Sequence, residues 1–193
     1  MKVLVTGAAG FIGGQLMHAL WKNGHTAIGV DNYSYGSADN LHFDDHDFSA
    51  DVIKMDIRDK EGMKALFEQE KFDIVYNIAG IAPLPDCQSD PVEAVSVNTL
   101  ENARRTGVKH VIQASTNAMY ENETEFPTVE SKFNPPTLIY PNTKYCGERF
   151  CQSFADTYGM NITCLRFANV YGPHRLPAQA AAVCGLYDPR AVL

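Results

Sequence analysis

Tyr140 and Lys144 lie four residues apart, and Ser115 and Thr116 precede them by one strand-to-helix connection. Four residues make about one helical turn, so the phenol and the ammonium group would share one face of a helix. The positive charge would stabilise the phenolate that a tyrosine must form to exchange protons near neutral pH. A free tyrosine titrates near pH ~10, so acting near neutrality requires roughly 4 kcal/mol of such stabilisation. The spacing therefore predicts acid–base chemistry at Tyr140.

A glycine-rich segment near the start of the chain predicts what would bind beside that tyrosine. Gly7, Gly10 and Gly13 follow an apolar stretch at residues 2–6, which predicts a strand, and open a predicted helix at about residues 11–22. Glycines at this spacing allow a tight turn, close approach of a pyrophosphate and close packing of the helix on the sheet. The first N–H groups of the helix can then bind phosphates. The segment predicts a dinucleotide site.

Carboxylates after the next strands favour one dinucleotide over another. Asp31 ends the second predicted strand (26–30), where it can accept hydrogen bonds from both hydroxyls of the adenosine ribose. Its charge would repel a 2′-phosphate, so NAD is favoured over NADP. Asp56 and Ile57 follow the third predicted strand, and we expect them to contact the adenine edge. A carboxylate in the position of Asp56 also commonly caps the next helix, and both interpretations stay open.

Strands and helices alternate along the chain, which predicts a parallel sheet covered on both faces. Further strands are predicted at 51–55, 73–77, 108–114 and 162–167. Further helices are predicted at 59–69 with Asp59 as its cap, between Pro91 and Arg105, and at 141–158. The acidic segment 39–51 predicts a solvated loop. We expect an α/β fold with a Rossmann-type, doubly wound parallel sheet over residues 1–174, and a short C-terminal remnant or tail at 175–193.

Charge and cysteine content exclude several classes of partner. The net charge of -7 argues against binding to nucleic acid or to an anionic membrane surface. The cysteines form no CxxC pair and no metal-like grouping with the histidines, so no metal is expected. An odd number of cysteines, five, fits reduced thiols in a cytoplasm. With no apolar run of membrane length and no apparent signal peptide, the sequence predicts a cytoplasmic protein.

Six segments together resemble the extended short-chain dehydrogenase/reductase family, the NAD-dependent nucleotide-sugar epimerases and dehydratases. They are VTGAAGFIG at 5–13, VDN at 30–32, AG at 79–80, AST at 114–116, YPNTK at 140–144 and RFANVYGP at 166–173. They occur in the order that the family has and cover about residues 1–174. Within the family, the chain is similar to the UDP-galactose 4-epimerase-like members, partly through Asp31-Asn32, Gly36 and Asn40-Leu41.

The resemblance implies a role for each site residue. Tyr140 would be the acid/base in hydride transfer to and from NAD, Lys144 would bind the nicotinamide ribose and lower the pKa of Tyr140, and Thr116 would bond the same substrate hydroxyl. Asn169 would touch the phosphates of a nucleotide sugar. The implied cofactor site consists of Gly7, Gly10, Phe11, Ile12, Gly13, Asp31, Asn32, Asp56, Ile57, Ala79, Gly80, Ser115, Tyr140, Lys144 and Phe167.

Departures from the family pattern narrow the predicted activity. The family's dehydratases place an Asp-Glu pair directly after the catalytic threonine, where this chain has Asn117-Ala118, so an epimerase or a simple reductase is favoured. Family members continue well beyond Pro173 into a substrate domain, of which about twenty residues are present here. With most of that domain absent, we expect weak activity, because rate depends on holding the substrate in place.

The leading prediction is an NAD-dependent oxidoreductase or epimerase resembling the UDP-hexose 4-epimerases. Two alternatives stay open: an NAD-binding module without turnover, and a reductase acting on small carbonyl compounds. The stretch after Asn98 is shorter than in the family by about six residues, which is not a whole number of helical turns. In relatives this helix and the 140–158 helix form the dimer interface. The resemblance thus allows a homodimer, but the shortened helix argues against it.

Overall fold

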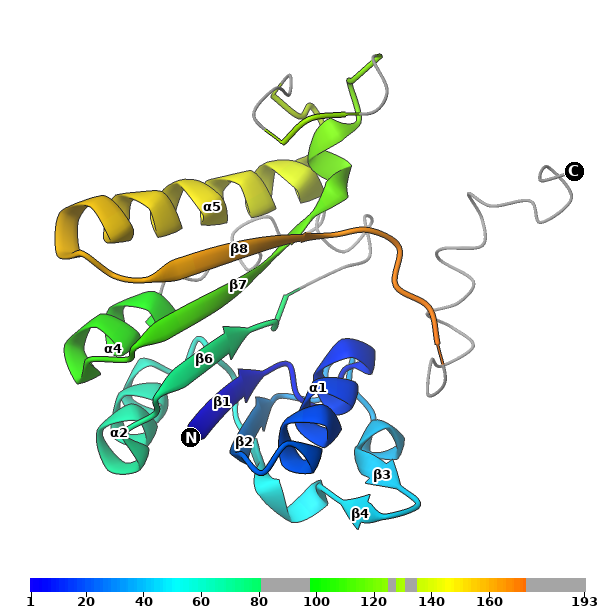
Figure 1. The fold of residues 1–193 in the computed structure, drawn as a ribbon, viewed down its shortest axis with the longest axis vertical. Helices are drawn as coiled ribbons and strands as arrows, with labels where there is room; N and C mark the ends of the chain where they lie inside the picture. Colours follow the sequence, from blue (N-terminus) through cyan, green and yellow to red (C-terminus); the bar gives the residue numbers. More distant parts are fainter. Residues whose placement is uncertain (81–97, 125–127, 131–134, 173–193) are drawn as a thin grey trace, which may run out of the picture.

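The computed structural model describes residues 1–80, 98–124, 128–130 and 135–172. Its main sheet has six parallel strands in the order β5-β2-β1-β6-β7-β8 (Figure 1). The strands are β1 (Lys2–Thr6), β2 (Thr26–Asp31), β5 (Val52–Lys54), β6 (Ile74–Asn77), β7 (His110–Thr116) and β8 (Ile162–Phe167). The chain starts at the central strand β1, adds β2 and β5 toward one edge of the sheet, and then adds β6, β7 and β8 toward the other edge. The predicted doubly wound Rossmann-type fold is confirmed.

Helices cover both faces of this sheet. They are α1 (Phe11–Lys22), α2 (Lys60–Glu70), α4 (Asn98–Thr106) and α5 (Ile139–Tyr158), with the short 3-10 helices η1 (Ala38–Leu41), η2 (Ser49–Asp51) and η3 (Asn117–Tyr120). Helix α1 packs on one face, and α2, α4 and α5 pack on the other. The predicted start of α4 near Pro91 and the predicted tail at 175–193 lie outside the described residues. Within them, no helix combines the length and apolar character needed to cross a membrane.

Alternation along the central strand explains the two cores. Leu4 faces the core shared with α2, α4 and α5, whereas Val3 and Val5 face the core shared with α1. All three side chains are fully buried. A strand buried on both faces favours apolar residues on both, which is why Val3, Leu4 and Val5 form a continuous hydrophobic run rather than an alternating one.

The ends of several elements differ from their predicted positions by a few residues. Asp59 caps α2 as predicted, because its carboxylate accepts a hydrogen bond from Gly62 N at 3.0 Å. Strand β7 continues through Thr116 rather than ending at residue 114, since its pairing with β8 extends to Phe167. Helix α5 begins at Ile139, two residues early, so Tyr140 already lies in its first turn.

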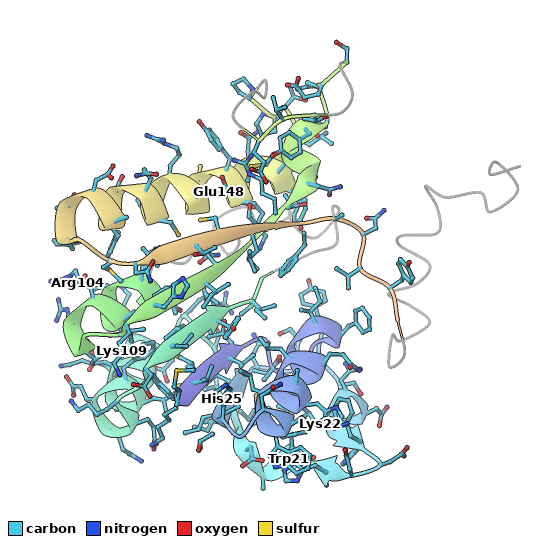
Figure 2. All side chains as sticks on the ribbon, in the orientation of Figure 1. Trp21, Lys22, His25, Arg104, Lys109 and Glu148 are labelled. Atoms are coloured by element: carbon cyan, nitrogen blue, oxygen red, sulfur yellow. The ribbon has the colours of Figure 1, made fainter. Side chains whose placement is uncertain are left out.

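The prediction of a simple solvated loop at residues 39–51 is wrong. This segment contains η1, η2 and a two-stranded hairpin, β3 (His42–Phe43) and β4 (His46–Asp47). Leu41 and Phe48 are buried in the core shared with α1. Trp21 of α1 stacks on His46, with ring centroids 4.6 Å apart, and Figure 2 shows it against the hairpin. The aromatic residues between the aspartates supply a small core that the acidic composition concealed.

Candidate active site

The predicted site residues gather where the parallel strands end. Each of the six strands contributes at its carboxyl end: the glycine turn after β1, Asp31 in β2, Asp56 after β5, Ala79 and Gly80 after β6, Thr116 in β7 and Phe167 in β8. Because all six strands run in the same direction, these ends share one edge of the sheet. That edge is where open α/β sheets bind their ligands.

The glycine turn between β1 and α1 is packed too closely against backbone to accept side chains at Gly7 or Gly13. Gly7 has φ +72°, a conformation that favours glycine, and a Cβ on Gly13 would lie 2.0 Å from the Gly7 carbonyl oxygen. Gly10 is the N-cap of α1, no described side chain caps the helix, and its first turn carries no acid. The N–H groups at this uncapped, acid-free helix N-terminus fit a pyrophosphate.

Asp31 holds the glycine turn as well as facing the predicted ribose position. Its Oδ2 accepts from Ala9 N at 2.9 Å, and its Oδ1 accepts from Tyr33 N at 2.7 Å. Burial raises the pKa of Asp31, and the two N–H groups partly offset this by stabilising the carboxylate. Each oxygen keeps a second acceptor site, which suits two ribose hydroxyls.

Asn40 clamps the same turn from the other side, a role that sequence reasoning missed. The side chain is 2% exposed, and its Nδ2 donates to the Ala9 carbonyl oxygen at 2.8 Å. Ser37 N donates to the same oxygen at 2.9 Å. In the sequence, Asn40 is notable only for the family resemblance. A polar residue directly before the buried Leu41 was the available signal.

Asp56 is engaged by its neighbours rather than capping a helix. Its carboxylate accepts from Arg58 Nε at 2.9 Å, Arg58 Nη2 at 2.7 Å, Arg58 N at 2.8 Å and Asn32 Nδ2 at 3.0 Å. These bonds, led by that of the Arg58 side chain, hold the pKa of Asp56 well below its usual range. The capping interpretation is wrong, since Asp59 caps α2. The side chain of Ile57 packs against the core, and contact of this pair with adenine stays a prediction.

Thr6, at the end of β1, holds the loop that leads to Gly80. Its hydroxyl accepts from Ile78 N and Ala79 N, each at 3.1 Å, and donates to Asn77 Oδ1 at 2.9 Å. The residue is fully buried. Sequence reasoning missed this role, and the signal was a hydroxyl closing an otherwise apolar strand.

Helix α5 brings the tyrosine–lysine pair to this loop. Lys144 Nζ lies 2.6 Å from the position that a Cβ on Gly80 would take, so the end of the lysine side chain packs against the backbone that follows β6. Tyr140 is half-buried one turn earlier on the helix. The structure thus brings Lys144 next to Gly80, a predicted cofactor residue, with Tyr140 one helical turn away.

The third predicted catalytic residue, Thr116, is the last residue of β7. It is 6% exposed, and its Oγ1 accepts from Ala118 N at 3.1 Å, which leaves its own proton to donate. The Oγ of Ser115 is buried with no hydrogen-bond partner among the described residues. Phe167 is half-buried at the end of β8, and Asn169 is exposed two residues later.

Glu121 ties the start of α5 to the turn after Thr116. Its Oε1 accepts from Thr137 N at 2.6 Å and from Leu138 N at 3.0 Å. Desolvation alone would raise the pKa of Glu121, but these bonds outweigh it and lower the pKa. The carboxylate therefore links Thr116 to the residues directly before Tyr140, which nothing in the local sequence indicated.

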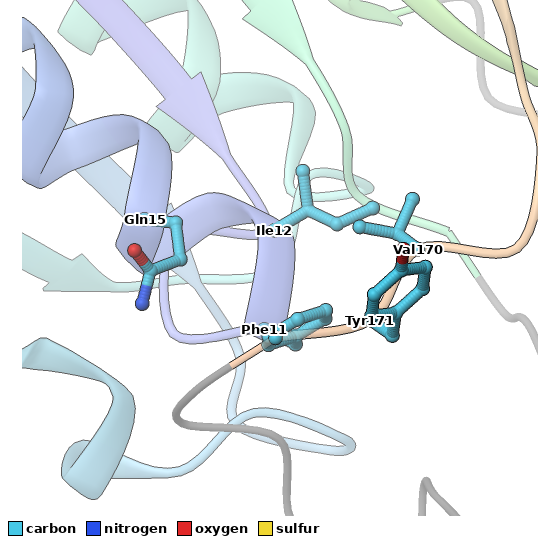
Figure 3. A pocket seen from close by; sticks show the side chains of 6 residues that line it. Phe11, Ile12, Gln15, Val170 and Tyr171 are labelled. Atoms are coloured by element: carbon cyan, nitrogen blue, oxygen red, sulfur yellow. The ribbon is translucent and has the colours of Figure 1, made fainter.

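A pocket of about 190 Å³ joins the first turn of α1 to the segment after β8. Figure 3 shows the side chains around it, mostly apolar ones. It is lined by Phe11, Ile12, Gln15, Val170, Tyr171 and Gly172. Two predicted cofactor residues, Phe11 and Ile12, therefore face the part of the chain that matches RFANVYGP.

Comparison with known proteins agrees with this arrangement. A family model described as the NAD-dependent epimerase/dehydratase family matches residues 3–186. The chain belongs to this family. The predicted resemblance to extended short-chain dehydrogenases/reductases is confirmed.

Similar family members include UDP-glucose 4-epimerases. One from Mycolicibacterium smegmatis is 31% identical over 195 residues, which cover 97% of this chain and 62% of that protein. The crystal structure of UDP-glucose 4-epimerase with UDP-glucose from Thermotoga maritima has a TM-score of 0.86 at 34% identity, covering 95% of this chain and 61% of that one. The Thermus thermophilus enzyme in complex with NAD has a TM-score of 0.83 at 29% identity, covering 96% and 61%. The chain thus spans about 60% of the length of these relatives.

The residues present fit the family's cofactor, NAD. The N–H groups at the uncapped start of α1 would bind the pyrophosphate, and the second acceptor sites of Asp31 would receive the ribose hydroxyls. The buried Ser115 Oγ, which has no partner among the described residues, adds a further polar atom at the end of β7. The charge of Asp31 disfavours a 2′-phosphate at the same place. NAD is therefore the cofactor that this site accommodates.

Proposed function

We propose that the chain acts as an NAD-dependent oxidoreductase or epimerase on nucleotide sugars, of the UDP-hexose 4-epimerase type, with Tyr140 as the acid/base. The observation that carries this proposal is the approach of Lys144 Nζ to Gly80, 2.6 Å from the Cβ position there. It supports a tyrosine–lysine pair that works at the edge of the sheet where the glycine turn lies. Similarity to UDP-glucose 4-epimerases supports the choice of substrate class.

The chemistry divides among three side chains. When bound, NAD supplies the acceptor and donor of hydride. Tyr140, as phenolate, would accept the proton of the substrate hydroxyl while the carbon bearing it is oxidised, and would return that proton when the carbonyl is reduced. The ammonium group of Lys144 would stabilise the phenolate. Thr116 would donate its hydroxyl proton in a hydrogen bond to the same substrate oxygen.

Epimerisation is favoured over dehydration because no acid directly follows Thr116. Elimination of water needs a group that protonates a leaving hydroxyl. Asn117 and Ala118 directly follow Thr116, and neither side chain is an acid. An epimerase instead needs the oxidised substrate to turn and present its other face before reduction, which asks for space rather than another acid.

Turnover by the 193 residues alone is expected to be slow. Holding a substrate in a near-attack geometry is worth several kcal/mol of the activation barrier, up to about 7–11 kcal/mol. The described residues supply the cofactor end of the site, and Asn169 is the one predicted contact to the nucleotide-sugar phosphates. A raised KM is therefore the expected signature.

Conversion of UDP-glucose to UDP-galactose, measured in a coupled assay with purified protein and NAD, tests this proposal. Tyr140→Phe should abolish conversion and retain NAD, whereas Tyr158→Phe, on the exposed end of the same helix, should change neither. NAD binding without any conversion would leave a binding module instead of an epimerase. NADH oxidation with simple aldehydes or ketones, but not with nucleotide sugars, would indicate a reductase.

A further inference from the structure

Arg166 on β8 joins three elements around α5. Its guanidinium donates to Glu148 of α5 twice, Nε to Oε1 at 2.9 Å and Nη2 to Oε2 at 2.7 Å. Its Nη1 donates to the Tyr120 hydroxyl of η3 at 2.5 Å and to the Glu130 carbonyl oxygen at 3.1 Å. The guanidinium carbon also lies 5.3 Å from the centre of the Tyr120 ring. One side chain thus connects β8, α5 and the turn that follows Thr116.

The Arg166–Glu148 pair is largely shielded from water. The Arg166 side chain is 20% exposed and that of Glu148 is 12% exposed. Two parallel bonds between a planar guanidinium and a carboxylate restrain orientation as well as distance. The bond from Glu148 also raises the pKa of Arg166, so the guanidinium stays charged. Exposed ion pairs contribute little to stability, but this one restrains the rotation of a helix.

Glu148 lies on the same face of α5 as the proposed catalytic pair. It follows Lys144 by four residues and Tyr140 by eight, which places the three about one helical turn apart. Helical side chains extend about 5–6 Å from the axis, so a rotation of about 10° displaces them by about 1 Å. Lys144 Nζ already lies against Gly80, so its position depends on the rotation of α5.

We propose that Arg166 is a positioning residue: through Glu148 it fixes the rotation of α5, and with it Lys144 and Tyr140, relative to Thr116 and the nicotinamide end of the cofactor. The proposal rests on the function proposed above. Arg166 contacts Glu148, Tyr120 and Glu130, so it would act through other side chains. Its loss should therefore weaken the nicotinamide end of the site and spare the adenosine end, which Asp31 and the glycine turn form.

Affinities for NAD and for ADP, measured by isothermal titration calorimetry, separate the two ends. ADP has the adenosine and the diphosphate but no nicotinamide riboside. Arg166→Gln and Glu148→Gln should each weaken NAD binding about tenfold, which corresponds to about 1.4 kcal/mol. ADP affinity should change less than about twofold. Arg166→Lys keeps the charge but not the two parallel bonds, so it should give an intermediate loss.

Arg104 of α4 provides a matched control. It forms the same kind of paired bonds to Glu101, both at 2.8 Å, and its guanidinium lies 4.7 Å from the centre of the Tyr158 ring. Figure 2 labels Arg104 on α4 and Glu148 on α5, away from each other. Arg104→Gln should leave the ratio of NAD to ADP affinity unchanged.

The outcomes separate this proposal from the proposed function. Equal loss of NAD and ADP affinity in Arg166→Gln, or a lowered melting temperature with an unchanged ratio, would assign Arg166 to stability alone and overturn the proposal. A wild-type chain that does not bind NAD overturns the proposed function as well. If circular dichroism shows Arg166→Gln to be unfolded, Glu148→Gln decides by the same ratio, since it keeps a neutral acceptor for the guanidinium.

Discussion

Replacing Thr6 by valine should destabilise the protein far more than its small change in shape suggests. Valine has almost the shape of threonine, so little cavity forms. The change removes the acceptor of Ile78 N and Ala79 N and the donor to Asn77 Oδ1, all in a fully buried place. At about 1 kcal/mol for each of the three bonds, the free energy of unfolding should fall by about 3 kcal/mol.

Urea unfolding followed by circular dichroism measures that loss, with Thr6→Ser as the control. Serine keeps the hydroxyl and loses one buried methyl group, which costs about 1 kcal/mol. Because Ala79 leads to Gly80, where Lys144 packs, Thr6→Val should also weaken NAD binding. A loss of less than about 1 kcal/mol in Thr6→Val, or equal losses in the two variants, would refute the account of Thr6 as the anchor of this loop.

Three further predictions concern other elements. Gly13→Ala puts a methyl group 2.0 Å from a backbone oxygen of the glycine turn and should weaken NAD binding at least tenfold, or about 1.4 kcal/mol. In Gly147→Ala, by contrast, the added methyl group on α5 meets nothing within 4 Å, so the free energy of unfolding should rise by about 0.5–1 kcal/mol. Urea unfolding measures this change, and a fall in stability would contradict it. Hydrogen bonds from Arg104 and then Arg105 lower the pKa of Glu101 from 4.5 to about 2. The stability that ionised Glu101 contributes to the folded state is therefore complete above pH 4.5 and is lost as the pH falls toward 2. Glu101→Gln should cost up to about 1 kcal/mol at pH 7, and unfolding at a series of pH values should show that difference shrinking in acid; a constant difference would contradict the ion pair.

Local patterns in the sequence predicted the elements and most of the site. Some features depend only on residues that are close in the sequence, and these can be predicted without knowing the fold. They are the apolar run of β1, the glycine spacing and Asp31. The same holds for Tyr140 and Lys144, because helical geometry alone brings residues four apart together. The alternation of strands and helices then predicts a parallel sheet, which gathers the strand ends at one edge.

Acidic composition misled where packing depends on a few residues. Residues 39–51 look like a solvated loop because aspartates dominate the segment. Phe48 and Leu41 bury themselves against α1 regardless, and Asn40 turns inward to clamp Ala9. Average polarity does not reveal which side chains of a short hairpin face a neighbouring helix.

The sequence by itself determined the fold class, the dinucleotide turn and the tyrosine–lysine pair, since each follows from spacing along one element. Only the tertiary structure decided what holds those parts in register. Thr6 meets Ala79 across 73 positions, Arg166 meets Glu148 across 18, and Asn40 meets Ala9 across 31. Such contacts arise when the sheet and helices close on one another, because hydrogen bonds at these separations depend on the relative placement of whole elements and not on any local pattern.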